Sequence, residues 1–164
     1  MTEIMQGGYT ANMNGRTLEN MVEDILKTKG YCELTAEEKK ILTKQDGEPP
    51  IPDKKWYCKQ VRLERNLYGA KYTMDFYVFD AHLFPDGLQI ETKWQSSSGS
   101  VDEKYCFTVL SLQRMSGIKI LILDGGGARQ GAIQWIKRQA EKKGFEYFTL
   151  TGFIIWANKT LKNN

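Results

Sequence analysis

Apolar residues recur with the spacing of a helix in the first part of the chain. In the segment 14–31, NGRTLENMVEDILKTKGY, leucine, methionine, valine and isoleucine return every three or four residues and form one stripe. This spacing predicts a helix that begins at Asn14 or Thr17 and stops at Gly30. Residues 1–13 have no such period, and we expect them to form a flexible N-terminal segment.

From Trp56 onward the apolar residues alternate with polar ones, which is the period of a β-strand. Segments 56–66 and 70–80 are predicted strands, joined by a turn around Tyr68 and Gly69. A second turn is predicted through Pro85, Asp86 and Gly87, followed by a strand, LQIETKWQ, at 88–95.

The rest of the chain predicts one mixed α/β domain that covers residues 14–164. Further predicted helices are 35–44, with Thr35 as N-cap, 101–117, 131–144 and 151–161, and further predicted strands are 118–124 and 145–150. The apolar run IKILILD is typical of a strand that is buried on both faces. We therefore expect a central mixed β-sheet, made of an antiparallel meander plus parallel strands and flanked by helices.

The composition is typical of an ordinary folded domain and does not indicate an activity. The chain has 164 residues, of which 41% are hydrophobic and 26% charged, as in ordinary folded domains. No apolar run reaches the roughly 20 residues of a membrane span, and the first residues lack the regions of a signal peptide, so a cytoplasmic location and no membrane partner are expected. Three cysteines without a CxxC pair argue against a disulfide framework or a structural zinc site. A net charge of +3 permits a nucleic-acid partner without requiring one.

The strand LQIETKWQ is a candidate for a catalytic site, because it has one apolar face and one polar face. Leucine, isoleucine, threonine and tryptophan alternate with a polar row of Gln89, Glu91, Lys93 and Gln95. Glu91 and Lys93 leave the same face at a spacing of roughly 6.5–7 Å. An exposed strand face with an ordinary surface ion pair is one interpretation of this row.

Asp75 on the preceding predicted strand suggests a second interpretation. If the two strands pair through the turn between them, Asp75 comes beside Glu91. Two adjacent carboxylates repel each other, and a divalent cation such as Mg²⁺ removes that repulsion. Lys93 beside them can hold a water molecule and offset charge that builds on phosphorus, so the row predicts a site for phosphodiester hydrolysis.

Asp75 followed by Glu91-Thr92-Lys93 resembles the PD-(D/E)XK nuclease signature, and the element order from Asn14 to Asp124 resembles the core of that fold. The resemblance implies a restriction endonuclease-like fold in which Asp75 and Glu91 bind Mg²⁺, for which Mn²⁺ can substitute, and Lys93 positions the attacking water. The proline that often precedes the first aspartate is absent, since Met74 stands there.

The same resemblance implies two assisting residues and a biological role. Glu19 on the first predicted helix and Gln95 after the lysine match residues that assist the metal site, Gln95 by orienting water or phosphate. The tract WQSSSGSVDEKY is most like that of small type II restriction endonucleases, which implies a homodimer that cuts double-stranded DNA. A structure-specific nuclease, such as a Holliday-junction resolvase or a phage or repair nuclease, and a non-catalytic nucleic-acid-binding domain of the same fold are the alternatives.

Four residues are candidates for contact with DNA. Gln60 and Arg62 lie on the first predicted strand, Lys55 flanks it, and Lys104 begins the helix after the polar row. Such side chains can contact phosphates or base edges, although a charged edge strand that is only solvated has the same pattern.

Three features compete with this assignment. Asp80 is the rival to Asp75 as first carboxylate, but its position favours a strand end. His82, the only histidine, lies in a turn without a partner motif, which favours a surface position. The sequence DGGGARQG follows a buried strand as a phosphate loop does, yet it lacks the GxGxxG spacing, and a tight strand-to-helix turn explains it better.

Overall fold

The computed structural model describes residues 3–44, 49–97, 102–142 and 144–161, with side chains from Gly15 onward. The helices are α1 (Glu3–Thr28), α2 (Ala36–Lys44), α3 (Asp102–Arg114), α4 (Gln130–Lys142) and α5 (Leu150–Thr160). The strands are β1 (Cys32–Glu33), β2 (Trp56–Val61), β3 (Met74–Asp80), β4 (Phe84–Trp94), β5 (Ile118–Asp124) and β6 (Glu146–Phe148).

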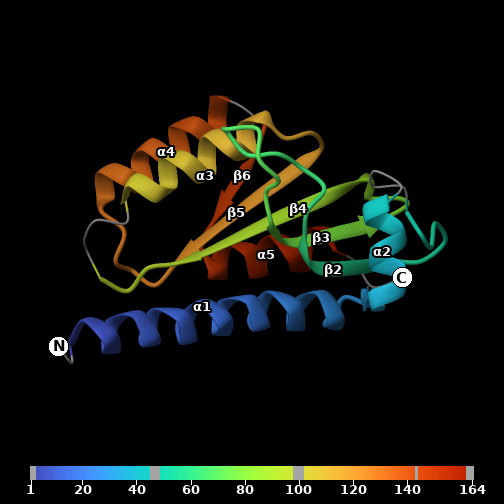
Figure 1. Ribbon diagram of the computed structural model, residues 1–164, viewed down its shortest axis with the longest axis horizontal. Helices are drawn as coiled ribbons and strands as arrows, with labels where there is room; N and C mark the ends of the chain where they lie inside the picture. Colours follow the sequence, from blue (N-terminus) through green and yellow to red (C-terminus); the bar gives the residue numbers. More distant parts are fainter. Residues whose placement is uncertain (1–2, 45–48, 98–101, 143, 162–164) are drawn as a thin grey trace.

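The six strands form one sheet in the order β1-β2-β3-β4-β5-β6. β2, β3 and β4 form an antiparallel meander, whereas β5 runs parallel to β4 and β6 parallel to β5. Helices α3 and α4 cover one face of the sheet, and α1 and α5 cover the other (Figure 1). The predicted mixed sheet flanked by helices is confirmed.

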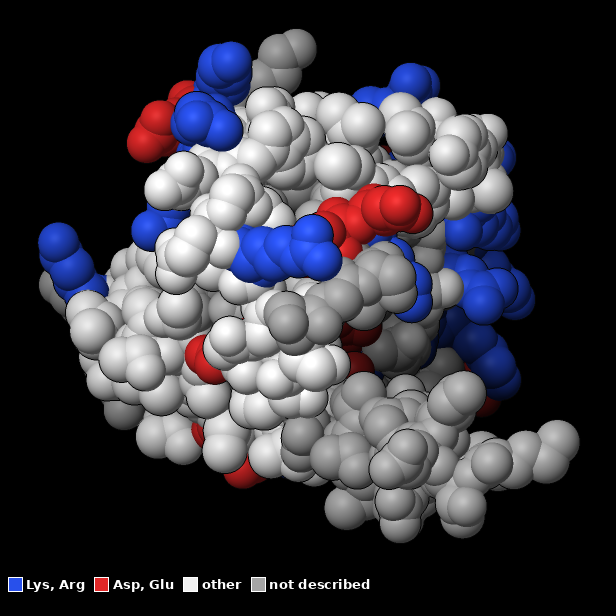
Figure 2. Space-filling model, turned by 90° about the vertical axis from the view of Figure 1, so that its left-hand side faces the viewer, with Lys and Arg blue, Asp and Glu red and all other residues white. Residues whose placement is uncertain are grey.

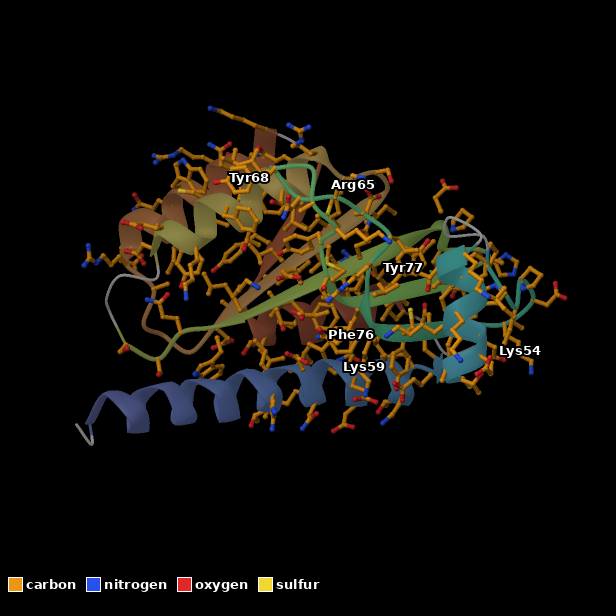
Figure 3. The ribbon with its side chains drawn as sticks, in the orientation of Figure 1. Lys54, Lys59, Arg65, Tyr68, Phe76 and Tyr77 are labelled. Atoms are coloured by element: carbon orange, nitrogen blue, oxygen red, sulfur yellow. The ribbon has the colours of Figure 1, made fainter. Side chains whose placement is uncertain are left out.

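Two apolar layers separate the sheet from its helices, and consecutive strand residues alternate between them. Phe76 packs with Leu18 and Val22 of α1, whereas Tyr77 packs in the layer of α3 (Figure 3). Each large apolar side chain that is buried in this way contributes about 1.5–3 kcal/mol. Because both faces are covered, β4 is buried on both sides, and its polar row does not lie on a solvated face.

Two predicted boundaries need correction, and one short strand was not predicted. The first helix begins at Glu3 and not at Asn14 or Thr17, because a helix that has formed once extends at little cost even through residues of poor propensity. The second turn lies at residues 81–83, while Pro85–Gly87 belong to β4 next to a register shift. The two-residue strand β1, which pairs with β2, was not predicted because it is too short for a period.

Two local predictions are confirmed by hydrogen bonds. Thr35 caps α2: its hydroxyl accepts from the Glu38 amide at 3.3 Å, and the Glu38 carboxylate accepts from the Thr35 amide at 2.8 Å. The glycine-rich segment is the predicted strand-to-helix turn: residues 125–129 join β5 to α4, and the Gly127 amide donates to the Gln95 carbonyl at 2.7 Å. A Cβ at Gly125 or Gly127 would lie 2.4 Å from backbone atoms that follow β4. α1 has 26 residues, yet among the described helices none has the length and apolar content to cross a membrane.

Candidate active site

Asp75 and Glu91 stand opposite each other on paired strands. The register of β3 and β4 joins Phe76 to Ile90, which brings Asp75 level with Glu91 at the end of β3. The pairing that the sequence predicts for these two carboxylates is therefore confirmed. Opposite residues of an antiparallel pair share one face, so both side chains leave the sheet on the same side.

Glu91 is almost completely buried, at 2% exposure. Its Oε1 accepts a hydrogen bond from the Tyr72 hydroxyl at 2.8 Å and forms an ion pair with the Lys93 Nζ. Its Oε2 is buried and has no hydrogen-bond partner among the described residues. Burial raises the pKa of Glu91 to about 7; Lys93 opposes this rise and the Asp75 charge adds to it.

Asp75 is half-buried and is held from two sides. Its Oδ2 accepts from the Thr92 amide at 2.7 Å and from the Thr92 hydroxyl at 2.8 Å, and its Oδ1 accepts from the Gln60 Nε2 at 3.2 Å. A carboxylate offers about four acceptor positions, so these three bonds leave one position on Oδ1 for a further ligand. Gln60 itself has a φ of 51°, a left-handed conformation that is uncommon for this residue type.

Lys93 and Glu19 complete the charged cluster. Burial lowers the pKa of Lys93, but the carboxylates of Glu91, Asp75 and Glu19 more than offset this, and the net pKa is raised. Glu19 on α1 is half-buried, and its pKa is raised by burial and by the Asp75 charge. The helix predicted to supply an assisting glutamate therefore brings Glu19 within the electrostatic range of the site.

Gln95 belongs to the same row but is engaged within the protein. Its Nε2 donates to the carbonyls of Ser97 at 2.9 Å and Gly127 at 3.4 Å, and its Oε1 accepts from the Tyr105 hydroxyl. These contacts fasten the segment after β4 to the glycine-rich turn and to α3. The predicted contact of Gln95 with water or phosphate gains no support, because both polar atoms of the amide are already bonded.

The four predicted DNA contacts lie in different places. Gln60 contacts Asp75, and Arg62 donates to the Thr73 hydroxyl at 2.8 Å next to the start of β3. Lys104 lines a pocket together with Lys93. Lys55 precedes β2, whose Trp56 pairs with Phe79, so it lies at the opposite end of β3 from Asp75, about 17 Å away at 3.4 Å per residue. Lys55 therefore lies apart from the other three residues, and its contact with DNA stays a prediction.

The two rival residues also lie at that opposite end. Asp80 is 4% exposed, and its carboxylate accepts from the Tyr31 hydroxyl at 3.1 Å and from the amides of His82 and Leu83 at 2.9 and 3.2 Å. It stabilises the turn between β3 and β4. His82 is exposed in that turn, as the sequence suggested.

Comparison with known proteins decides the family. A profile described as PD-(D/E)XK nuclease superfamily domain matches residues 10–161. The chain belongs to the PD-(D/E)XK nuclease superfamily. No curated protein and no solved structure matches it significantly. Nucleases of this superfamily generally use divalent metal ions.

The PD-(D/E)XK signature residues have two partners that the sequence did not reveal. Tyr72 donates to Glu91, and Thr92 binds Asp75 through both its amide and its hydroxyl. Thr92 was assigned to the apolar face by alternation, although its place between Glu91 and Lys93 was a usable signal. Tyr72 has no signal in the local pattern, because only the fold brings it to Glu91.

The site fits a divalent cation through two carboxylates and not through a protein cage. Within residues 3–44, 49–97, 102–142 and 144–161, no group of three or more His, Cys, Asp and Glu side chains is placed to hold a metal ion. The unpartnered Oε2 of Glu91 and the remaining acceptor position of Asp75 are oxygen ligands of the type that Mg²⁺ prefers. Mg²⁺ usually keeps several waters and takes only one or two carboxylates.

Proposed function

We propose that this domain is a Mg²⁺-dependent endonuclease that hydrolyses phosphodiester bonds in DNA. The observation that supports it best is the buried carboxylate of Glu91, which has one oxygen without a partner, lies opposite Asp75 and is paired with Lys93. A stable protein rarely leaves a buried carboxylate oxygen without a partner, so a ligand that supplies positive charge is expected there.

Each residue has a distinct task in this proposal. Asp75 and Glu91 hold the cation, which when bound supplies the Lewis acidity that activates water and neutralises phosphate charge. Lys93 donates from Nζ to the attacking water and to the developing negative charge on the phosphate. Glu19 interacts electrostatically with Asp75 and Lys93, and in this proposal it orients water on the α1 side.

The surface around the site suits a polyanion. Figure 2 looks onto the end of the molecule at which β4 runs out between its helices, and lysine and arginine side chains gather along one edge of this face. Gln60, Arg62 and Lys104 are the predicted contacts that lie near the site. Arg62 and Lys104 are basic and can bind the phosphate backbone without reading its sequence, and the neutral Gln60 can donate a hydrogen bond to it.

We propose two alternative biological roles. A type II restriction endonuclease that acts as a homodimer on double-stranded DNA in the cytoplasm remains the prediction from the tract after Lys93, and it requires discrete fragments from a plasmid. A structure-specific nuclease is the second candidate, and a pocket with aromatic walls beside Lys93 favours it.

The test is a cleavage assay on plasmid and labelled oligonucleotides with Mg²⁺, with Mn²⁺ and with EDTA. Wild-type protein is expected to cut with either metal ion and not with EDTA. Glu91→Gln should lower the rate by about a hundredfold or more, since even outer partners of metal ligands cost 10–100-fold.

The matched control is Glu23→Gln, which changes another buried glutamate that is paired with a lysine and a tyrosine. This variant should cut at a rate close to that of the wild type. Cutting by Glu91→Gln at the wild-type rate, or cutting in EDTA, would contradict the proposal.

A further inference from the structure

A pocket of about 460 Å³ opens beside Lys93, between the turn that follows β2 and the start of α3. We call it the aromatic pocket, defined by Tyr68, Tyr72 and Phe107 with the cations Lys93 and Lys104. Its volume is in the range of ligand-binding pockets. Figure 3 shows Tyr68 above the sheet, beside α3.

The aromatic pocket is continuous with the candidate active site. Tyr72 lines the pocket with its ring, and its hydroxyl donates to Glu91 at 2.8 Å. Lys93 lines the pocket and is also paired with Glu91. A group that enters the pocket would therefore lie directly beside a phosphate held by Lys93 and by a cation at Glu91.

Tyr68 is unusual because its large ring is 80% exposed while its backbone is firmly held. Its amide donates to the Asn66 Oδ1 at 2.9 Å, and the next residue, Gly69, has a φ of 79° that favours glycine. The Leu67 amide donates to the Ser111 hydroxyl of α3 at 3.1 Å, which fastens the turn to that helix. The fold thus holds the backbone that presents this exposed aromatic side chain.

The rings form a short row that leads from the surface to the site. The centroid of Tyr68 lies 5.6 Å from that of Phe107, and the centroid of Phe107 lies 6.4 Å from that of Tyr72. The tilts are 31° and 33°, so the rings offer a roughly continuous apolar wall. Lys93 and Lys104 add two positive charges at this wall and Glu103 adds one negative charge, so the lining keeps a net positive charge that suits an aromatic group attached to phosphate.

A nucleobase is the aromatic group that a phosphodiester carries. Bases in an intact duplex have both faces covered by their neighbours, whereas an unpaired base has a free face to stack on protein rings. Aromatic side chains beside a basic groove are the usual means by which proteins bind single-stranded nucleic acid. The combination therefore favours an unpaired nucleotide over a paired one.

We propose that the aromatic pocket binds an unpaired base next to the scissile phosphate, so that the preferred substrate is DNA with a bulged, displaced or single-stranded nucleotide. This proposal rests on the proposed nuclease function, because it takes the scissile phosphate to be held by Lys93 and by the cation at Glu91, and it favours the structure-specific role over the restriction role. Tyr68 acts as the outer stacking surface, and Phe107 and Tyr72 form the inner wall.

The experiment compares three labelled substrates of one sequence: an intact duplex, the same duplex with one unpaired nucleotide, and the single strand. Cleavage rates are measured with Mg²⁺, and binding is measured by fluorescence anisotropy in EDTA. Wild-type protein should favour the substrate with an unpaired base by about tenfold in rate and in affinity, the effect of stacking one base. Tyr68→Ala should lose most of this ratio, whereas Tyr68→Phe should keep it because the ring remains.

Ile155→Ala is the matched surface control, because Ile155 is 64% exposed on α5, on the other side of the sheet. It should leave the ratio unchanged. Equal rates on the duplex and the unpaired substrate, or a ratio that Tyr68→Ala does not alter, would overturn the inference and leave the proposed function intact. Failure to cut any substrate would overturn the proposed function, and the binding ratios would still decide whether the pocket selects an unpaired base.

Discussion

Glu91 and Glu23 lie in two clusters built from the same three residue types. Each glutamate accepts a hydrogen bond of 2.8 Å from a tyrosine, Tyr72 or Tyr57, and each is paired with a lysine, Lys93 or Lys59. Both glutamates are buried, at 2% and 8% exposure. Their pKa values nevertheless depart from the ordinary value in opposite directions, to about 7 for Glu91 and to about 2 for Glu23.

The number of partners explains the difference. Burial raises the pKa of Glu23 as well, but hydrogen bonds from Lys59, Lys27 and Tyr57 outweigh it. Both oxygens of Glu23 are engaged, with Lys27 at 2.9 Å and Lys59 at 2.8 Å. Glu91 has a single lysine, an oxygen without a partner and the Asp75 charge nearby. In the Glu23 cluster each oxygen of the Glu23 carboxylate has a cationic partner, whereas the Glu91 cluster has one lysine for three carboxylates.

The largest expected effect is on the cleavage rate, and it differs between the variants of Lys93 and Lys59. Lys93→Ala should lower the cleavage rate by about 10²–10³-fold, because it removes the cation that faces the developing phosphate charge. Lys59→Ala should leave the rate within a few-fold of wild type, since Lys59 serves Glu23 and Glu33. Single-turnover cleavage with saturating Mg²⁺ measures both. Equal losses in the two variants would contradict the distinction between the clusters.

A second prediction concerns stability at the Glu23 cluster. The folded pKa of about 2 lies below the ordinary value of 4.5, so ionised Glu23 stabilises the protein above pH 4.5, and this contribution is lost as the pH falls toward 2. Glu23→Gln should therefore lower the free energy of unfolding by up to about 3 kcal/mol at pH 7. Urea unfolding at several pH values measures it, and a loss that persists unchanged at pH 2.5 would argue against this cause.

The third prediction is that ionised Glu91 lowers the stability of the fold, the opposite of the effect of Glu23. The folded pKa of Glu91, about 7, lies above the ordinary value of 4.5, so the ionised carboxylate destabilises the fold progressively from pH 4.5 to 7 and fully above that. Without divalent metal, Glu91→Gln should raise the melting temperature at pH 8, and this gain should vanish below pH 4.5. A lower melting temperature for this variant at pH 8 would count against the account.

The sequence predicted those parts of the site that depend on alternation along a strand. The period of two in LQIETKWQ placed Glu91 and Lys93 on one face, and the short connection to the preceding strand placed Asp75 opposite. The alternation could not show that helices cover this face. Because they do, the polar row is buried, and the Gln95 amide forms hydrogen bonds with Tyr105 and Gly127.

Residues that join the site from distant segments escaped prediction for a physical reason. Tyr72 reaches Glu91, and Tyr68 approaches Phe107, only after the meander packs on α3, and no local period records that packing. The separation of Lys55 from Asp75 could not be predicted, because closeness to a strand in sequence does not say at which end of that strand a side chain lies. The start of α1 was missed because its backbone continues beyond the stripe that contacts the core.

Direct titration of metal ions tests the central claim, that the carboxylates of the Glu91 cluster have too few cationic partners and those of the Glu23 cluster do not. Calorimetric titration with Mg²⁺ or Mn²⁺ at pH 8, in the absence of nucleic acid, compares wild type, Glu91→Gln and Glu23→Gln. Wild type and Glu23→Gln should bind the ion with similar affinity, and Glu91→Gln should bind it at least about tenfold more weakly. Unchanged binding by Glu91→Gln, or loss of binding by Glu23→Gln alone, would contradict the account.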